Sequence, residues 1–261
     1  MTDQPPAFDA VGQTVYDAQH IVRKERRRTV DEREAFRAFG TRLTQIQPAS
    51  AGHTVPATVR GAGVEDGGSN ATKRVLGAYR QTVMAVPHYE SEYGDTVGRS
   101  IVEEFGPSVG GALVSADGLT PELQGVVAEA AREAASDRES FVSLLDDEAE
   151  SLAAALDSIE TVAARLRSLD DRPLPARSFD ELRDLRESVA ELERRAVDLH
   201  VDRQAEIKSH RQRLAVTDVD LPTFLYQDRP YTYPVLTAAT TLAETVARAC
   251  RRVERQLTVT V

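Results

Sequence analysis

The chain has 261 residues, enough for one large domain or two small ones with a sizeable core, and only 5% of them are aromatic. Its formal net charge is −10, and all of its 32 basic residues except Lys24, Lys73 and Lys208 are arginine. This acidic balance argues against broad binding to nucleic acids or anionic membranes, because both rely on a basic surface.

Two explanations account for the scarcity of lysine. A carboxylate-rich surface keeps its hydration in molar salt, where the Debye length is only about 3 Å, so a halophilic source is expected. A high-GC genome also favours arginine over lysine, although it does not explain the acid excess. The single cysteine, Cys250, excludes an intrachain disulfide. With no secretory signal at the start, a reducing, cytoplasmic location is expected.

The first predicted helix covers residues 8–46 and ends at Gln47-Pro48. The side chains spaced three and four residues apart share one face of this helix and form a stripe along it. The stripe is apolar at both ends but polar in the middle, so its centre is either exposed to solvent or paired with a specific partner. The stripe steps by three and four residues through Phe8, Val11, Val15, Ala18, Val22, Glu25, Thr29, Glu32, Phe36, Phe39, Leu43 and Ile46.

Residues 47–70 are rich in Gly, Ser, Ala and Pro, a composition typical of a flexible loop. A helix is predicted over 71–86 with Asn70 as its N-cap, because asparagine is favoured at that position. Pro87 ends it, and a further helix is predicted over 88–105. A short apolar helix over 108–115 is expected after Gly106-Pro107.

Thr120-Pro121 is a strong helix start, and no breaker follows before Arg172-Pro173. A capping box, Ser178–Glu181, then opens a helix that extends to about residue 216. Two long amphipathic helices joined by a short turn bury their stripes by folding back on each other, which predicts a coiled-coil-like antiparallel hairpin over 121–216.

The hairpin also predicts a register. If the turn brings residue 170 beside residue 179, facing positions have numbers that add to about 350. Polar interruptions of the two stripes then meet as two structural charge pairs, Glu148 with Arg203 and Asp137 with Arg213. Opposite charges within a helical seam are best known for setting its register.

Pro234 starts a last predicted helix, which extends to residue 257. The segments 71–116 and 218–257 flank the hairpin and are expected to form a bundle-like head at its base, within one all-α domain over 1–261. Six of the seven tyrosines fall there: Tyr79, Tyr89, Tyr93, Tyr226, Tyr231 and Tyr233.

A metal site has only weak support. His88, Glu92 and Asp95 share one face of a predicted helix, and Glu25 and Glu32 lie in the polar centre of the first helix. However, di-iron bundles use Glu-x-x-His pairs, and the chain contains none. In so acidic a chain, helix capping and surface pairing explain these residues better than metal ligation. No nucleophile motif or phosphate-binding loop is present, so no cofactor is expected.

Several segments resemble a haloarchaeal all-helical family of unknown function. They are the helix with Arg23-Lys-Glu-Arg-Arg-Arg28, then Tyr79–Met84, Pro87–Asp95, Glu104-Phe-Gly, and Phe224-Leu-Tyr with Tyr233-Pro-Val-Leu. The resemblance covers nearly the whole chain. It implies a halophilic source but no activity, cofactor or site residue.

Three functions fit these observations. The leading hypothesis is a non-enzymatic protein–protein interaction or regulatory module, whose partner is another protein or a second copy of the chain. The alternative is a helical bundle that binds a metal or small ligand, with or without enzymatic activity. A nucleic-acid role for the run Arg23–Arg28 comes third, because Glu25, Asp31, Glu32 and Glu34 lie within one or two turns of it.

Overall fold

A computed structural model describes residues 8–48, 67–213 and 220–260 of the chain. These residues form eight α-helices, two short 3-10 helices and no strand, so the predicted all-α class is confirmed. The chain divides into two compact units, the first comprising Met1–Glu25 and Leu144–Val261 and the second Arg26–Ser143. Two long helices, α1 (Phe8–Thr44) and α5 (Pro121–Leu169), contribute residues to both units.

The predicted helical hairpin forms in the first unit, where the end of α5 turns through η3 (Leu174–Ala176) into α6 (Phe179–Arg213). Arg177 holds the turn, because its Nη2 donates to the carbonyl oxygen of Leu169 at 2.9 Å. The predicted capping box is confirmed. The amide of Ser178 donates to Oε2 of Glu181 at 2.7 Å, and the amide of Glu181 donates to Oγ of Ser178 at 3.3 Å.

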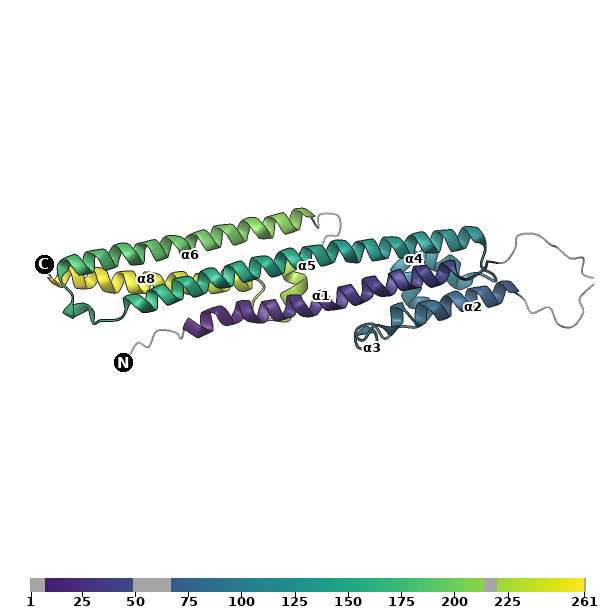
Figure 1. Ribbon diagram of the computed structural model, residues 1–261, viewed down its shortest axis with the longest axis horizontal. Coiled ribbons are helices and arrows are strands. Elements are labelled where there is room, and N and C mark those ends of the chain that lie inside the picture. Colours follow the sequence, from purple (N-terminus) through teal and green to yellow (C-terminus); the bar gives the residue numbers. More distant parts are fainter. Residues whose placement is uncertain (1–7, 49–66, 214–219, 261) are drawn as a thin grey trace, which may run out of the picture. The chain divides into compact units, whose positions relative to one another are not determined.

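Apolar residues at helical spacing build the core of the first unit. The helix α8 (Pro234–Thr260) lies along α6 and covers the hairpin seam, while the short α7 (Leu221–Tyr226) precedes it (Figure 1). Because each stripe repeats at about 3.5 residues, it stays on the side of its helix that faces the partners. The buried seam residues include Leu145, Leu152, Ile159, Leu166, Leu182, Val189, Leu192, Val235, Leu242 and Val246.

An aromatic cluster forms the core of the second unit. This unit contains the later part of α1, α2 (Gly67–Arg80), η2 (Val83–Ala85), α3 (Tyr89–Glu92), α4 (Val97–Ser115) and the first part of α5. The rings of Phe39 and Tyr79 meet edge to face with centroids 5.3 Å apart, and Phe105 stacks on Phe39 at 6.1 Å. Such pairs stabilise by about 0.5–1.5 kcal/mol beyond the area they bury.

The sequence-based hairpin was too long at its base. Residues 121–143 of α5 belong to the second unit, where Val127, Ala131 and Ala134 join the same core as Phe39 and Leu43 of α1. The stripe of α5 is continuous in sequence, so its spacing alone does not indicate where α6 ceases to pack against it, whereas α1 contacts α5 in both units.

The two tyrosine-rich segments fall in different units. Tyr79, Tyr89 and Tyr93 lie in the second unit, whereas Tyr226, Tyr231 and Tyr233 lie in the first. The fully buried Tyr79 and Tyr226 are therefore parts of different cores.

Several helix boundaries differ from the prediction. Asn70 lies inside α2, which begins at Gly67, so it is not the N-cap; residues 49–66 of the predicted loop fall outside the described ranges. The helix predicted over 88–105 is split, because Gly94 adopts a φ of 59° after α3. Thr96 caps the start of α4, and its hydroxyl accepts from the amide of Arg99 at 3.4 Å.

A sharp kink at Gly106, with φ 76° and ψ 166°, joins the short helix predicted over 108–115 to the residues before it as α4. The kink brings Gly110 against the backbone of the preceding turns. A Cβ atom at Gly110 would lie 2.5 Å from the carbonyl oxygen of Ile101 and 2.7 Å from Cα of Val102. Only glycine fits this close approach.

Replacing Gly110 with alanine is therefore expected to destabilise the protein by about 1–3 kcal/mol, because backbone atoms must move to admit the methyl group. The matched control is Gly111→Ala, since a Cβ there meets nothing within 4 Å. Alanine in a helix is favoured over glycine by about 1 kcal/mol, so the control is expected to be neutral or stabilising. Urea unfolding followed by circular dichroism measures both; equal effects would contradict the close approach.

Candidate functional site

The most deeply buried charges of the first unit lie in the seam between α5 and α6. Glu148 of α5 and Arg203 of α6 are 1% and 3% exposed, and Nη2 of Arg203 lies 2.7 Å from Oε1 of Glu148. The same carboxylate oxygen accepts a hydrogen bond from the hydroxyl of Tyr226 at 3.0 Å. Three elements, α5, α6 and α7, therefore meet at one carboxylate.

Further polar groups complete this cluster. Nη1 of Arg203 donates to Oγ of Ser151 at 2.7 Å and lies 3.2 Å from Oε2 of Glu206. Nδ1 of His210, one further turn along α6, is 3.5 Å from Oε2 of Glu148. A guanidinium carries five N–H donors and no acceptor, so carboxylate and hydroxyl oxygens are the partners that it needs when buried.

The cluster keeps Arg203 charged and Tyr226 neutral. Burial opposes the charge of Arg203, but the neighbouring Glu148 carboxylate outweighs it, and the pKa of Arg203 is raised. Burial first, and then the charge and hydrogen bond of Glu148, raise the pKa of Tyr226. Glu148, Arg203 and Tyr226 are each at least nine-tenths buried, whereas the side chain of Glu206 at the edge of the cluster is 43% exposed. The cluster joins α5, α6 and α7 through buried contacts.

The second predicted charge pair, Asp137 with Arg213, includes a side chain outside the described residues. Asp137 is exposed on the part of α5 that belongs to the second unit. The side chain of Arg213, at the end of α6, lies outside the described residues.

A second polar cluster surrounds Glu32, in the polar centre of α1. Nε2 of His88 lies 3.0 Å from Oε1 of Glu32, and the hydroxyl of Tyr93 donates to the same oxygen at 3.2 Å. Since an ionised carboxylate only accepts, Nε2 of His88 carries the proton in this contact. The polar stretch of the α1 stripe is therefore paired at this position and not simply exposed to solvent.

Arg138 of α5 connects this carboxylate to α4. Its Nε lies 3.2 Å from Oε2 of Glu32, and its two terminal nitrogens make a bidentate contact with Glu104, at 2.9 Å for Nη2–Oε2. The guanidinium also lies over the ring of Phe36, 4.8 Å from its centroid. One arginine thus links α1, α4 and α5 within the second unit.

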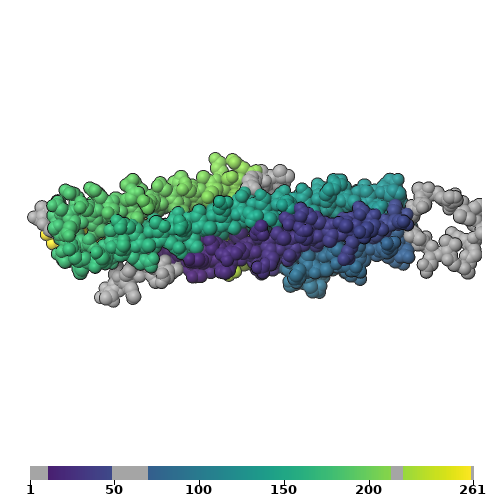
Figure 2. Space-filling view, viewed as in Figure 1, coloured from purple at the N-terminus to yellow at the C-terminus, as the bar shows by residue number. Residues whose placement is uncertain are grey.

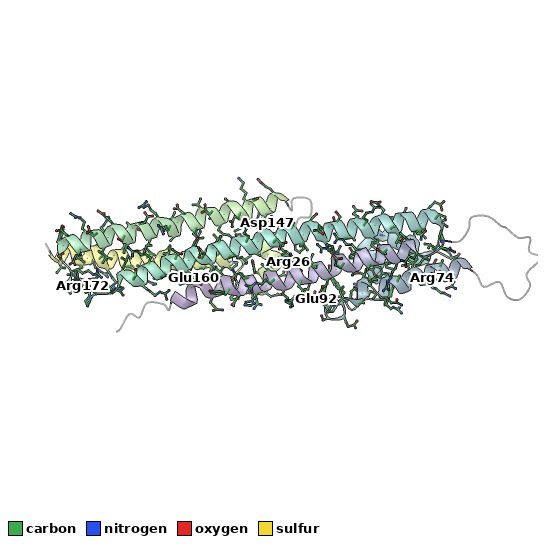
Figure 3. The ribbon with its side chains drawn as sticks, viewed as in Figure 1. Arg26, Arg74, Glu92, Asp147, Glu160 and Arg172 are labelled. Carbon is green, nitrogen blue, oxygen red and sulfur yellow. The ribbon has the colours of Figure 1, made fainter. Side chains whose placement is uncertain are left out.

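The five metal candidates do not converge. His88 meets Glu32, but Glu92, labelled in Figure 3, pairs with Arg28, and Oδ1 of Asp95 pairs with Arg99 at 3.2 Å. Glu25 belongs to the first unit and Glu32 to the second. Within residues 8–48, 67–213 and 220–260, no group of three or more His, Cys, Asp or Glu side chains is arranged to hold a metal ion.

An open groove lies between α1 and α5 in the second unit. Its volume is about 700 Å³. In Figure 2 these two helices run side by side on the viewed face of this unit, with no other segment over the boundary between them. Small side chains make its walls and charged ones its rim, and the lining residues are Phe36, Arg37, Gly40, Thr41, Thr44, Ala128, Ala131, Arg132, Ala135, Ser136 and Glu139.

The charges at the rim are exposed and of both signs. Glu139 lies between Arg33 and Arg37, with contacts of 2.7 and 2.9 Å, while Arg132 pairs with Glu129 on its own helix. Sequence reasoning did not find this groove. The available signal was the series of small residues on α5, Ala128, Ala131 and Ala135, which leaves a hollow on a face that no other helix covers.

These features define an all-α protein built from long paired helices, with buried charge clusters inside the packing and an open helix–helix groove in the second unit. The family described as Domain of unknown function (DUF7260) matches residues 13–250, and the chain belongs to that family. No curated protein and no solved structure gives a significant match. Among the described helices, none combines the length and apolar character needed to cross a bilayer.

Removing one partner of the Glu148–Arg203 pair is expected to lower the free energy of unfolding by about 3–5 kcal/mol, because an unpaired charge stays buried. Glu148→Leu and Arg203→Met are the single changes, and the double variant should cost less than either. Chemical unfolding provides the measurement, with Arg183→Met as the control for a pair on the exposed surface of α6. If the loss of stability in the double variant equals the sum of the two single losses, the charges do not act as a pair.

The raised pKa of Tyr226 predicts an alkaline loss of stability. Unfolded tyrosine ionises near pH 10, whereas folded Tyr226 keeps its proton above that pH. The unfolded state then binds fewer protons, so the free energy of unfolding falls as pH rises above about 10, by up to about 1.4 kcal/mol per unit for this group. The free energy of unfolding of the Tyr226→Phe variant should fall less steeply with pH than that of the wild type. Urea titrations from about pH 8 to 11 measure it. A slope identical to that of the wild type would contradict this assignment.

Proposed function

We propose that the protein is a non-enzymatic protein–protein interaction or regulatory module that receives a helix of its partner in the α1–α5 groove. The observation that carries the proposal is the groove itself, open to solvent and lined by Gly40, Ala128, Ala131 and Ala135. Small side chains let a third helix approach two others closely, and amphipathic helices commonly bind in such grooves.

The size of the groove fits this occupant. Its lining on α5 extends from Ala128 to Glu139, about 16 Å at 1.5 Å per residue, which corresponds to about three helical turns. The rim alternates in sign, with Arg37 and Arg132 near Glu139, so the expected partner helix has a small or apolar face flanked by charges of both signs. A uniformly anionic ligand such as nucleic acid fits such a rim poorly.

The polar clusters support the same function indirectly. Glu148, Arg203, Glu32 and Arg138 are occupied by one another and by neighbouring side chains, so they offer little to a substrate or cofactor. A halophilic source belongs to the proposal as well, because the acidic, lysine-poor composition suits molar salt. The crosslinking test in a cell extract is therefore designed for molar KCl.

Filling the groove is expected to abolish partner binding. Gly40→Leu places a side chain where a Cβ meets nothing within 4 Å, so it occupies the groove without a clash at its base. The control, Gly125→Leu, changes a glycine of α5 with equally open surroundings that does not line the groove. Replacing glycine within a helix is favourable by up to about 1 kcal/mol, so both variants should fold.

The measurement is photo-crosslinking from a benzophenone side chain at Thr41, in the full chain incubated with an extract of its source cells in molar KCl. Adducts are expected to fall at least about ten-fold in the Gly40→Leu background, equivalent to about 1.4 kcal/mol of lost binding, and to persist with Gly125→Leu. The proposal would be overturned by adducts that are equally abundant in both backgrounds.

A further inference from the structure

We infer that the helix received by the groove is α5 of a second copy of this chain, so that the groove mediates an antiparallel, two-fold symmetric dimer. This inference rests on the proposed function and names its partner. Four of the groove-lining residues of α5, Arg132, Ala135, Ser136 and Glu139, form a self-complementary pattern. In a two-fold interface the same patch meets itself, so a patch that is complementary to itself is the signature required.

The pattern fixes where the axis lies. A two-fold axis midway between Ala135 and Ser136 places Arg132 of each copy opposite Glu139 of the other. Arg132 and Glu139 are seven residues, or about two turns, apart and both line the groove, so they share one face of α5. The two symmetric contacts are therefore both between opposite charges.

The positions between and beyond these charges are small. The same axis places Ala128 opposite Ser143, with Ala135 opposite Ser136 at the centre. Helix axes approach within 8–10 Å according to the side chains at the contact, and small ones give the shorter distances. On the flank contributed by α1, Gly40 and Thr41 leave further room.

The present partners of these charges do not prevent the exchange. Arg132 pairs with Glu129 three residues away, where the side chains are 68% and 62% exposed, and such surface pairs contribute only about 0–1 kcal/mol. Glu139 is 53% exposed beside Arg33 and Arg37, and a carboxylate has room for a third donor. Exclusion of water from the interface strengthens each new contact, which favours the dimer.

Charge reversal is the sharpest test of the assignment. The full chain is studied by sedimentation velocity at about 0.15 M ionic strength, where the Debye length of about 8 Å leaves charge contacts measurable. Arg132→Glu and Glu139→Arg each create two like-charge contacts in the dimer, so each is expected to weaken dimerisation at least about ten-fold. The double variant restores opposite charges and should recover to within about three-fold of the wild type.

The double variant separates contacts between copies from those within one chain. Within a single chain it places a glutamate near Glu129 and an arginine near Arg33 and Arg37. If only internal pairs mattered, it would therefore be the worst of the three variants. Recovery of the dimer supports the inference, and a double variant weaker than both single ones overturns it.

Cysteine crosslinking tests the position of the axis independently. In a Cys250→Ala background, Ser136→Cys places the two thiols next to the axis, and mild oxidation should give a disulfide-linked dimer. The matched control is Ser158→Cys, an exposed serine on the part of α5 that lies in the first unit. Crosslinking at Ser136 that disappears when Arg132→Glu is added supports the inference.

A wild-type chain that is monomeric at high concentration, with no crosslinking at Ser136 above the control, overturns the second-copy assignment. The proposed function survives that result if Thr41 still gives adducts that require an open groove, since the partner is then a helix of another protein. Loss of both the Ser136 crosslink and the Thr41 adducts rejects the two proposals together. Loss of the Ser136 crosslink alone rejects only the second-copy assignment.

Discussion

A carboxylate buried among apolar side chains needs an opposite charge, and the packing of the first unit depends on how Glu148 meets that need. Its contact with Arg203 joins α5 to α6, and the hydroxyl of Tyr226 adds α7 to the same oxygen. A slip of either helix along the seam would leave both charges buried and unpaired, which costs several kcal/mol. Apolar contacts supply most of the favourable energy, and we propose that this pair sets the register of the two helices.

The pairing of buried opposite charges also joins the helices of the second unit, through Glu32 and Arg138. It limits the chemistry that these side chains can offer. A side chain already occupied by a buried partner is a poor ligand for a metal and a poor general acid or base, because its lone pairs and protons are committed. His88 illustrates this, since it faces Glu32 while Glu92 and Asp95 pair with nearby arginines. Recognition is therefore expected where helix packing is incomplete, which in the second unit is the groove between α1 and α5.

Much of the fold follows from the sequence because helical stripes, capping residues and prolines are local signals. The Ser178–Glu181 capping box and the turn between α5 and α6 were predicted from a few residues each. Choice of packing partner is not local. The stripe of α5 looks the same on both sides of residue 143, yet Val127 packs in one core and Leu152 in the other.

The groove was harder to predict from the sequence. A groove forms where side chains are small and where the helices around it leave space, and neither condition is a local signal. Alanines at helical spacing usually indicate close packing inside a core, and Ala131 and Ala135 do contribute to one. Their other role, as lining of the groove between α1 and α5, becomes visible only in the folded structure.

The most direct test of recognition through this groove is a pulsed electron–electron distance measurement on the full chain with a single nitroxide label at Ser136 and alanine at position 250. A monomer carries one spin and gives no specific distance. We predict a narrow distribution centred below about 25 Å, because labels next to a two-fold axis between closely packed helices lie within a few helix radii of each other. Absence of a defined distance at concentrations that saturate dimerisation would contradict the self-association through α5.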